Sequence, residues 1–284
     1  MPDATLLDWL ARKYPLAKRQ TLKRMVEARR VRINGRPALT LKQSLGPKDQ
    51  IEVSDLKSDA LSSAKDRGPT IRVIYEDGDL IVVDKPPGLL TSTVPRERRP
   101  TLLAAVRAHV AAAEPRARVG LIHRLDRDAS GLLIFSKNDP AYRSLKTQFF
   151  HHTVIREYRA VVHGTPNPPE GRIENRLIEH NDGTVHATKQ IGRGQVAISD
   201  YQVLKTEGRL SLVRVTLHTG RKHQIRVHLA GNGNPVMGDT VYGPRDAKAA
   251  RLMLAATRLV ISHPGTGKEQ EFLLPSPREF PVRG

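Results

Sequence analysis

Hydrophobic positions along the chain follow two different spacings, and the change comes near residue 71. Before that point Leu22, Met25 and Val26 are spaced i, i+3 and i+4, which predicts a helix with one apolar face. After it, short apolar runs bounded by glycine, proline or aspartate predict strands. These runs cover residues 71–75, 80–83, 158–163, 196–204, 210–217, 254–262 and 269–274. The pattern indicates a mixed α/β domain rich in hairpins rather than an alternating, doubly wound one.

Helices are predicted at three places among these strands. One covers residues 101–110, and another runs from Asp139 to about residue 149, with Asp139 as its cap and Pro140 at the first helical position. The third begins at Lys222 and stops at the glycine-rich stretch that follows residue 230. In this last helix Arg226 lies on a basic face, opposite an apolar packing side.

The spacing change divides the chain into two predicted domains. Residues 1–53 form a small basic domain with 12 Lys and Arg against 5 Asp and Glu, and residues 31–36 predict a strand that enters an Asn-Gly turn. Residues 54–70 lack periodicity and are rich in Ser, Asp and Lys, which predicts a flexible linker. Residues 71–284 form the larger domain.

Charge and composition narrow the class of protein. The chain carries 47 Lys and Arg against 29 Asp and Glu, a formal net charge of +18, so a polyanion such as nucleic acid is the expected partner. The absence of cysteine excludes disulfides, thiolate catalysis and cysteine-based metal sites. Neither a membrane-spanning run nor a signal peptide is evident, so we expect a cytoplasmic protein. No glycine-rich phosphate loop indicates a nucleotide cofactor.

The polar run Leu-Ile-His-Arg-Leu-Asp-Arg-Asp-Ala-Ser-Gly over residues 121–131 is the first candidate site. It places Asp126 between Arg124 and Arg127, at the end of a short predicted strand, where a scaffold can hold a catalytic loop still. Neighbouring arginines favour the ionised carboxylate, which suits a nucleophile or an electrostatic stabiliser. Two alternatives stay open: a surface salt-bridge cluster, and a Mg²⁺ site using Asp126 and Asp128, which has few carboxylates for a hard metal.

A second polar cluster covers residues 217–229 and contains three histidines. His218, His223 and His228 are spaced by five residues, about 140° apart around a helix, so they do not share one face and a histidine metal site is not expected. Elsewhere, strand alternation allows Tyr158 either to line a pocket beside Asp126 or to fill the core, and the residues alone favour the core.

Four motifs in order resemble the RluA-type pseudouridine synthases. They are Asp84-Lys-Pro-Pro-Gly88, His123-Arg-Leu-Asp-Arg-Asp-Ala-Ser-Gly131, Arg156-Glu-Tyr158 and Gly220-Arg-Lys-His-Gln-Ile-Arg226. The resemblance covers about residues 71–275, and the first 53 residues resemble the alpha-L RNA-binding motif. It implies an α/β (α+β) pseudouridine synthase fold with a mostly antiparallel central sheet and an RNA-binding cleft. The implied reaction isomerises uridine in RNA without metal or cofactor. We expect the protein to be a monomer.

The resemblance also implies which residues act. Asp126 matches the catalytic aspartate, Tyr158 the pocket tyrosine and Arg226 the arginine that pairs with the aspartate. RNA contact or support is implied for Arg124, Lys85 and Arg221, and the basic N-terminal domain adds Arg19, Lys23, Arg24, Arg29 and Arg30. One position departs from the family, because Ala129 stands where a threonine is usual.

The substrate and the role remain open at this point. Large-subunit ribosomal RNA is favoured over transfer RNA by analogy with proteins that carry the same N-terminal motif. A non-catalytic RNA-binding or ribosome-assembly factor would share the charge and the N-terminal domain. A metal-dependent nuclease would instead rely on the two aspartates of the 121–131 run.

Overall fold

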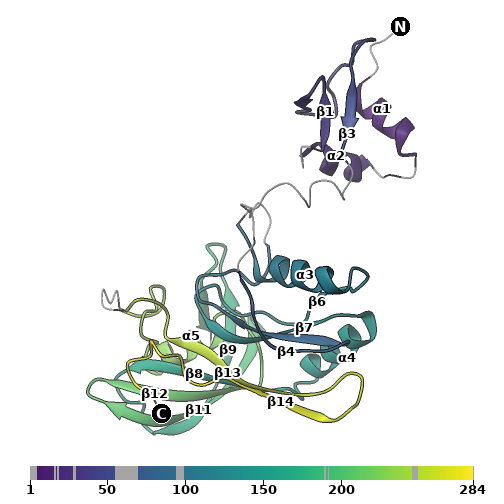
Figure 1. The fold of residues 1–284 in the computed structure, drawn as a ribbon. Coiled ribbons are helices and arrows are strands. Elements are labelled where there is room, and N and C mark those ends of the chain that lie inside the picture. Colours follow the sequence, from purple (N-terminus) through teal and green to yellow (C-terminus); the bar gives the residue numbers. More distant parts are fainter. Residues whose placement is uncertain are drawn as a thin grey trace. The chain divides into compact units, whose positions relative to one another are not determined.

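The computed structural model describes residues 5–15, 17, 19–27, 30–54, 70–93, 99–188, 190, 192–244 and 249–283. The chain divides into two compact units, residues 1–67 and 68–284 (Figure 1). The predicted linker lies almost wholly outside the described residues. No helix in the described part of the chain is both long and apolar enough to cross a lipid bilayer.

The N-terminal unit packs two helices on a small antiparallel sheet. Its elements are α1 (Leu6–Lys13), α2 (Arg19–Glu27), β1 (Val31–Ile33), β2 (Arg36–Pro37) and β3 (Ile51–Val53), with strand order β2-β1-β3. The predicted apolar face of α2 is confirmed, because Leu22, Met25 and Val26 are all buried in the core of this unit. The Asn34-Gly35 turn has φ of 52° and 78°, the left-handed values that Asn and Gly tolerate best.

The second unit is built on an eleven-stranded sheet, as far as the described residues go. Its strands are β4 (Arg72–Glu76), β5 (Leu80–Lys85), β6 (Gly120–Leu121), β7 (Ser130–Ser136), β8 (Ile155–His163), β9 (Glu170–Glu179), β10 (Val185–Thr188), β11 (Gln195–Glu207), β12 (Leu210–Leu217), β13 (Leu254–Ser262) and β14 (Glu269–Leu273). The main order is β10-β9-β11-β12-β8-β13-β7-β5-β4, with β14 beside β13 and β6 beside β7. Among the described pairings between strands of this sheet, only β13 with β7 is parallel, which agrees with the predicted mostly antiparallel sheet.

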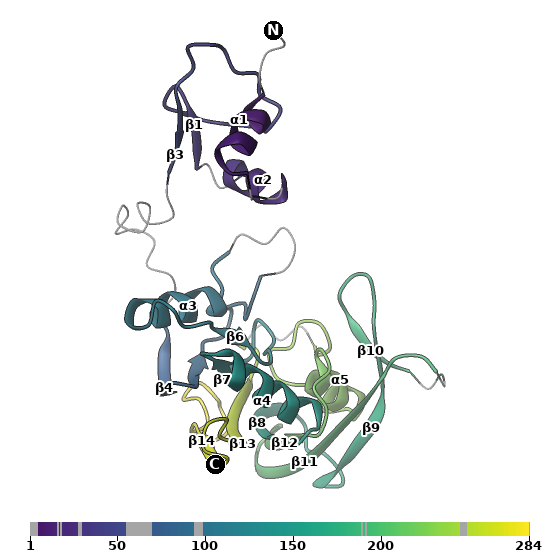
Figure 2. The ribbon, with the colours of Figure 1, turned by 90° about the vertical axis from the view of Figure 1, so that its right-hand side faces the viewer.

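Three helices accompany this sheet: α3 (Leu102–Ala113), α4 (Asp139–Phe150) and α5 (Gln224–Gly231). Helix α4 packs against β7, while α5 lies beside β10 and β11 (Figure 2). Strand β7 is buried along its whole length, because its neighbours and the packed helix leave neither face to solvent. The centre of the sheet therefore forms a rigid core beneath the loops that precede β7 and α5.

Several predicted details were wrong. Strands β9 and β10 were not predicted, because much of β9 is exposed and its sequence has no apolar run. Helix α4 is capped by Asn138, whose side chain accepts a hydrogen bond from the N–H of Ala141, so Asp139 is the first helical residue. Helix α5 is buried on nearly all sides and has no solvated basic face.

Candidate active site

The loop that carries Asp126 is fixed on both sides of that residue. It joins β6 to β7, and the buried Thr91 hydroxyl donates to the carbonyl of Leu125 at 2.9 Å and accepts from the N–H of Leu125 at 3.3 Å. The Lys85 ammonium donates to the carbonyls of Arg127 at 2.8 Å and Pro86 at 2.9 Å. Asp126 therefore stands between two anchored peptide groups, which limits the positions its carboxylate can take.

Lys85 supports this loop and does not face solvent. Its exposed fraction is 0%, so Lys85 cannot touch RNA in this structure. Of the two roles expected for it, RNA contact or support, only support is left. Burial lowers the pKa of Lys85 to about 8, against the opposing influence of Asp128 and Asp126.

The ion-pair partner of Asp126 is Arg226 rather than its sequence neighbour Arg127. The Nη1 atom of Arg226 lies 3.5 Å from Oδ2 of Asp126, across 100 positions in sequence. Arg127 instead forms two hydrogen bonds, of 2.9 and 3.1 Å, with Asp128. The prediction that the flanking arginines pair with Asp126 was therefore wrong: Arg127 is occupied in an exposed pair with Asp128, and Arg124 forms no hydrogen bond or ion pair with Asp126 among the described residues.

Arg226 is held mainly by Asp239, a residue that the sequence analysis missed. Its Nε and Nη2 atoms donate to the two carboxylate oxygens of Asp239 at 2.7 and 2.8 Å, and the Asp239 side chain is fully buried. Oδ1 of Asp239 also accepts from the N–H groups of Val241 and Tyr242. Burial alone would raise the pKa of Asp239, but the hydrogen bonds and positive charge of Arg226, together with the N–H groups of Tyr242 and Val241, outweigh it and lower the pKa. No periodicity or motif in the sequence analysis singled out this aspartate.

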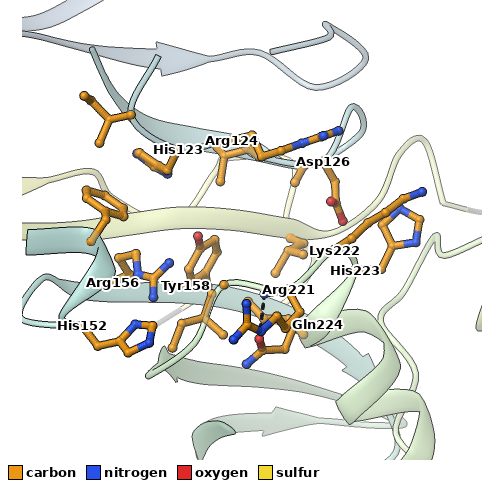
Figure 3. A pocket seen from close by; sticks show the side chains of 18 of the residues that line it. His123, Arg124, Asp126, His152, Arg156, Tyr158, Arg221, Lys222, His223 and Gln224 are labelled. Atoms are coloured by element: carbon orange, nitrogen blue, oxygen red, sulfur yellow. Dashed lines mark hydrogen bonds between the residues drawn. The ribbon is translucent and has the colours of Figure 1, made fainter. Parts of the chain in front are cut away.

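A pocket of about 420 Å³ opens beside Asp126 (Figure 3). Asp126 is the only carboxylate among the described residues that line it, and its side chain is 22% exposed. Four cationic side chains line the same pocket: Arg124, Arg156, Arg221 and Lys222. The apolar and aromatic walls include Phe149, Phe150, Tyr158, Leu217, Ile225 and Leu254. The size suits a small planar group bound to apolar walls with a few polar contacts.

Tyr158 both fills the core and lines this pocket. It lies on β8 and is 6% exposed, so the two alternatives weighed from the sequence are not exclusive. Burial raises the pKa of Tyr158, although Arg156 opposes this shift. The hydroxyl therefore stays protonated near neutral pH.

Comparisons with known proteins agree with this geometry. The sequence profile of the RNA pseudouridylate synthase family matches residues 79–231. An uncharacterized RNA pseudouridine synthase of Bacillus subtilis (strain 168) is 35% identical over 279 residues, which cover 92% of this chain and 87% of the relative. The chain belongs to the RluA-type RNA pseudouridine synthases.

Another relative is the ribosomal large subunit pseudouridine synthase D of Haemophilus influenzae, 30% identical over 286 residues that cover 95% of this synthase and 87% of the relative. Among solved structures, human RNA Pseudouridylate Synthase Domain Containing 4 covers 74% of this synthase and 90% of its own chain, with 23% identity and a TM-score of 0.62. That likeness confirms the predicted pseudouridine synthase fold.

Gln224 organises the second polar cluster of the synthase, residues 217–229. Its side-chain oxygen accepts from the Thr219 hydroxyl at 2.8 Å and the N–H of Arg221 at 3.0 Å. Its amide nitrogen donates to the carbonyl of Ile198 and the hydroxyl of Ser199. These bonds fix the turn before α5, which explains how Arg221 comes to the pocket rim, where its Nε also donates to Val196.

The three histidines of this cluster do not gather around one point. His218 pairs with Asp200, His223 contacts the Tyr242 hydroxyl at 2.8 Å, and His228 is buried against Ser199 and Asn175. Within the described ranges, no three His, Asp or Glu side chains come together as a possible metal site.

The other residues predicted to contact RNA differ in how exposed their side chains are. Arg124 is exposed at the pocket, and Arg19 and Lys23 are exposed on α2. Arg30 donates two hydrogen bonds, of 3.2 and 2.9 Å, to the carbonyl of Ser54, so much of its guanidinium is occupied within its own unit. The last two predicted contacts fall outside what is described: Arg24 lies in α2, but only its backbone is described, and Arg29 lies outside the described residues.

Proposed function

We propose that this synthase isomerises uridines of large-subunit ribosomal RNA, with Asp126, Tyr158 and Arg226 at the reacting nucleotide. One observation carries the assignment. The only carboxylate among the described residues that line a cationic, base-sized pocket stands on a loop anchored at both neighbouring peptides. A buried arginine, itself held by a buried carboxylate, lies behind it.

The reaction needs no external reagent. The target uridine leaves the RNA stack and enters the pocket, so that its sugar meets Asp126. Asp126 begins the cleavage of the bond between C1′ and N1, either by attack on the sugar or by removal of a sugar proton. The freed uracil turns, C5 bonds to C1′, the C5 proton leaves and N1 gains a proton. Atoms and electrons balance, and the net change is an isomerisation.

The neighbouring side chains suit this sequence of steps. Arg226 holds the Asp126 carboxylate in place beside the sugar. Tyr158 provides a buried wall against which the base packs, and its protonated hydroxyl can take part in proton movement at C5. Arg124, exposed at the pocket, holds the RNA strand on either side of the extruded nucleotide.

The ribosomal substrate is supported by the relatives and by charge. Proteins named ribosomal large subunit pseudouridine synthase D from Haemophilus influenzae and Neisseria meningitidis each align with 95% of this chain, which extends the likeness beyond the catalytic unit. We assign the basic N-terminal unit to RNA binding through exposed side chains such as Arg19 and Lys23. Large-subunit ribosomal RNA is preferred over transfer RNA on these two grounds.

Tritium release from RNA labelled at C5 of uridine tests the catalytic assignment. With EDTA present, the wild type should release tritium from unmodified large-subunit RNA, and Asp126→Asn should release none while binding the RNA almost as well. The matched control is Asp128→Asn, a carboxylate in the same loop whose partner is Arg127. Equal loss in both variants, or release by Asp126→Asn, would contradict the assignment.

Mapping of pseudouridines in cells that lack the gene tests the substrate. We expect sites to disappear from large-subunit ribosomal RNA, and their disappearance from transfer RNA alone would refute the ribosomal proposal. Complementation with Asp126→Asn tests a purely structural role, because a non-catalytic assembly factor would be rescued fully by this variant.

A further inference from the structure

Arg156 lines the pocket as a buried cation that has neither a counterion nor a hydrogen-bond partner among the described residues. It lies on β8, is 8% exposed, and its Nε is buried with no hydrogen-bond partner. Its guanidinium makes neither a hydrogen bond nor an ion pair with any residue in the described part of the chain. The guanidinium lies 5.5 Å from the centre of the Phe149 ring and packs against Gly220, where a Cβ atom would come within 2.8 Å of Nη1.

This arrangement is unfavourable for the free enzyme. An arginine removed from water without a counterion loses hydration that nothing within the fold replaces. Loss of a proton does not relieve this cost of burial, because the guanidinium stays charged even though burial lowers its pKa. What distinguishes Arg156 is its place, because its unpaired guanidinium borders the pocket, where an oxygen atom of a ligand can accept from it.

We propose that Arg156 donates hydrogen bonds to a carbonyl oxygen of the uracil base in the pocket, and so helps to select uridine. The proposal rests on the function proposed above. Arg156 and Tyr158 are two residues apart on one face of β8, and Figure 3 shows Tyr158 between Arg156 and Asp126. A nucleotide with its sugar at Asp126 and its base along Tyr158 thus points the base edge toward Arg156.

Uracil suits a donor that stays in place throughout the reaction. Rejoining through C5 requires the ring to turn about its N3–C6 axis, and this turn exchanges the C2 and C4 carbonyl groups. A carbonyl oxygen can therefore face Arg156 before and after the turn. Cytosine would present an amino donor to the guanidinium at one of these stages, and a buried site rejects a donor opposite a donor.

Arg156→Met tests the requirement for this donor. The substrate is a synthetic RNA stem-loop that carries the mapped target uridine, and the measurements are the single-turnover rate constant, the RNA dissociation constant and the unfolding midpoint. We expect the rate to fall roughly 100-fold, as when one transition-state donor is removed, and RNA affinity to change less than threefold. The unfolding midpoint of the free enzyme should not fall, because an unpaired buried charge has been removed.

Arg159→Met is the matched control. Arg159 lies on the opposite face of β8, and its Nη1 is also buried without a hydrogen-bond partner. We expect this control to keep its rate within threefold of the wild type. Arg156→Lys, which keeps a charge but not the forked donor, should be slower than wild type and faster than Arg156→Met. A rate for Arg156→Met within threefold of wild type, or a large fall in its unfolding midpoint, would overturn the proposal.

Modified substrates distinguish the base from a phosphate as the source of the bound oxygen. A 4-thiouridine at the target should slow the wild type but change the rate of Arg156→Met little, since the weak sulfur acceptor matters only when the donor is present. If a methylphosphonate beside the target shows this coupling instead, Arg156 binds phosphate and the uracil assignment is wrong. If Asp126→Asn is inactive but Arg156→Met is as active as the wild type, the role of Arg156 is refuted while the proposed function stands.

Discussion

The substitution Asp239→Asn tests how Arg226, the partner of the proposed catalytic Asp126, is held. Asp239 accepts two hydrogen bonds from Arg226 and two from backbone N–H groups, all within a buried site. An asparagine can keep the oxygen that faces Val241 and Tyr242. Its amide would then place an NH₂ group against Nε of Arg226, donor against donor, and the charge that balances Arg226 is lost.

The magnitude follows from the burial of both partners. Removing one member of a buried ion pair costs about 3–5 kcal/mol, because the remaining charge stays in a poorly hydrated place. For a unit of this length, each kcal/mol shifts the unfolding midpoint by about 2–4 °C, so a decrease of about 6–20 °C is expected. Arg226 should also turn toward Asp126, which is 3.5 Å away, and misplace its carboxylate, so the single-turnover rate should fall.

Thermal and urea unfolding followed by far-UV circular dichroism measure this change, since the eleven-stranded sheet dominates the signal. The single tryptophan, Trp9, belongs to the N-terminal unit, so its fluorescence reports that unit and should show an unchanged transition. The double variant Asp239→Leu with Arg226→Met should recover most of the stability without recovering activity. A loss below about 1 kcal/mol in Asp239→Asn would refute the view that this buried pair holds Arg226.

Three further predictions concern the loop, acid stability and RNA affinity. Thr91→Val should lower the free energy of unfolding by about 1–3 kcal/mol by leaving the Leu125 peptide groups unsatisfied, and should slow turnover more than it weakens RNA binding; equal effects on the two would contradict a positioning role. Burial alone would raise the pKa of Asp77, but hydrogen bonds from the N–H of Leu80 and from His263 outweigh it and lower the pKa to about 2. The lowered pKa contributes about 2 kcal/mol to the free energy of unfolding above about pH 4, and this contribution is lost as the pH falls to about 2. In acid titration the free energy of unfolding of Asp77→Asn should therefore decline less steeply than that of the wild type. Identical curves would refute this. Lys23→Glu should reduce the slope of log affinity against log salt by about 1–2 without changing the rate for bound RNA, and an unchanged slope would exclude RNA contact there.

The sequence by itself determined most of the central sheet. Strands β12 and β13 begin and end where their apolar runs do, because strands buried on both faces need apolar side chains at nearly every position. It did not reveal β9 and β10, whose exposed residues carry mixed polar and apolar side chains. Strand β9 pairs with β11, which follows later in the chain, and β10 pairs only with β9 among the described strands. Local composition cannot specify a strand that is stabilised by hydrogen bonds to a remote neighbour.

The resemblance of four sequence motifs to the family singled out Asp126, Tyr158 and Arg226 as a catalytic group, and their roles stay a prediction. Only the tertiary structure decided how they are held. It gave Asp126 a partner 100 positions away instead of an adjacent arginine, placed Asp239 behind Arg226, and left Arg156 unpaired at the pocket wall. Spacing along the chain encodes which face of an element a side chain occupies, whereas ion pairing and burial depend on which elements the fold brings together.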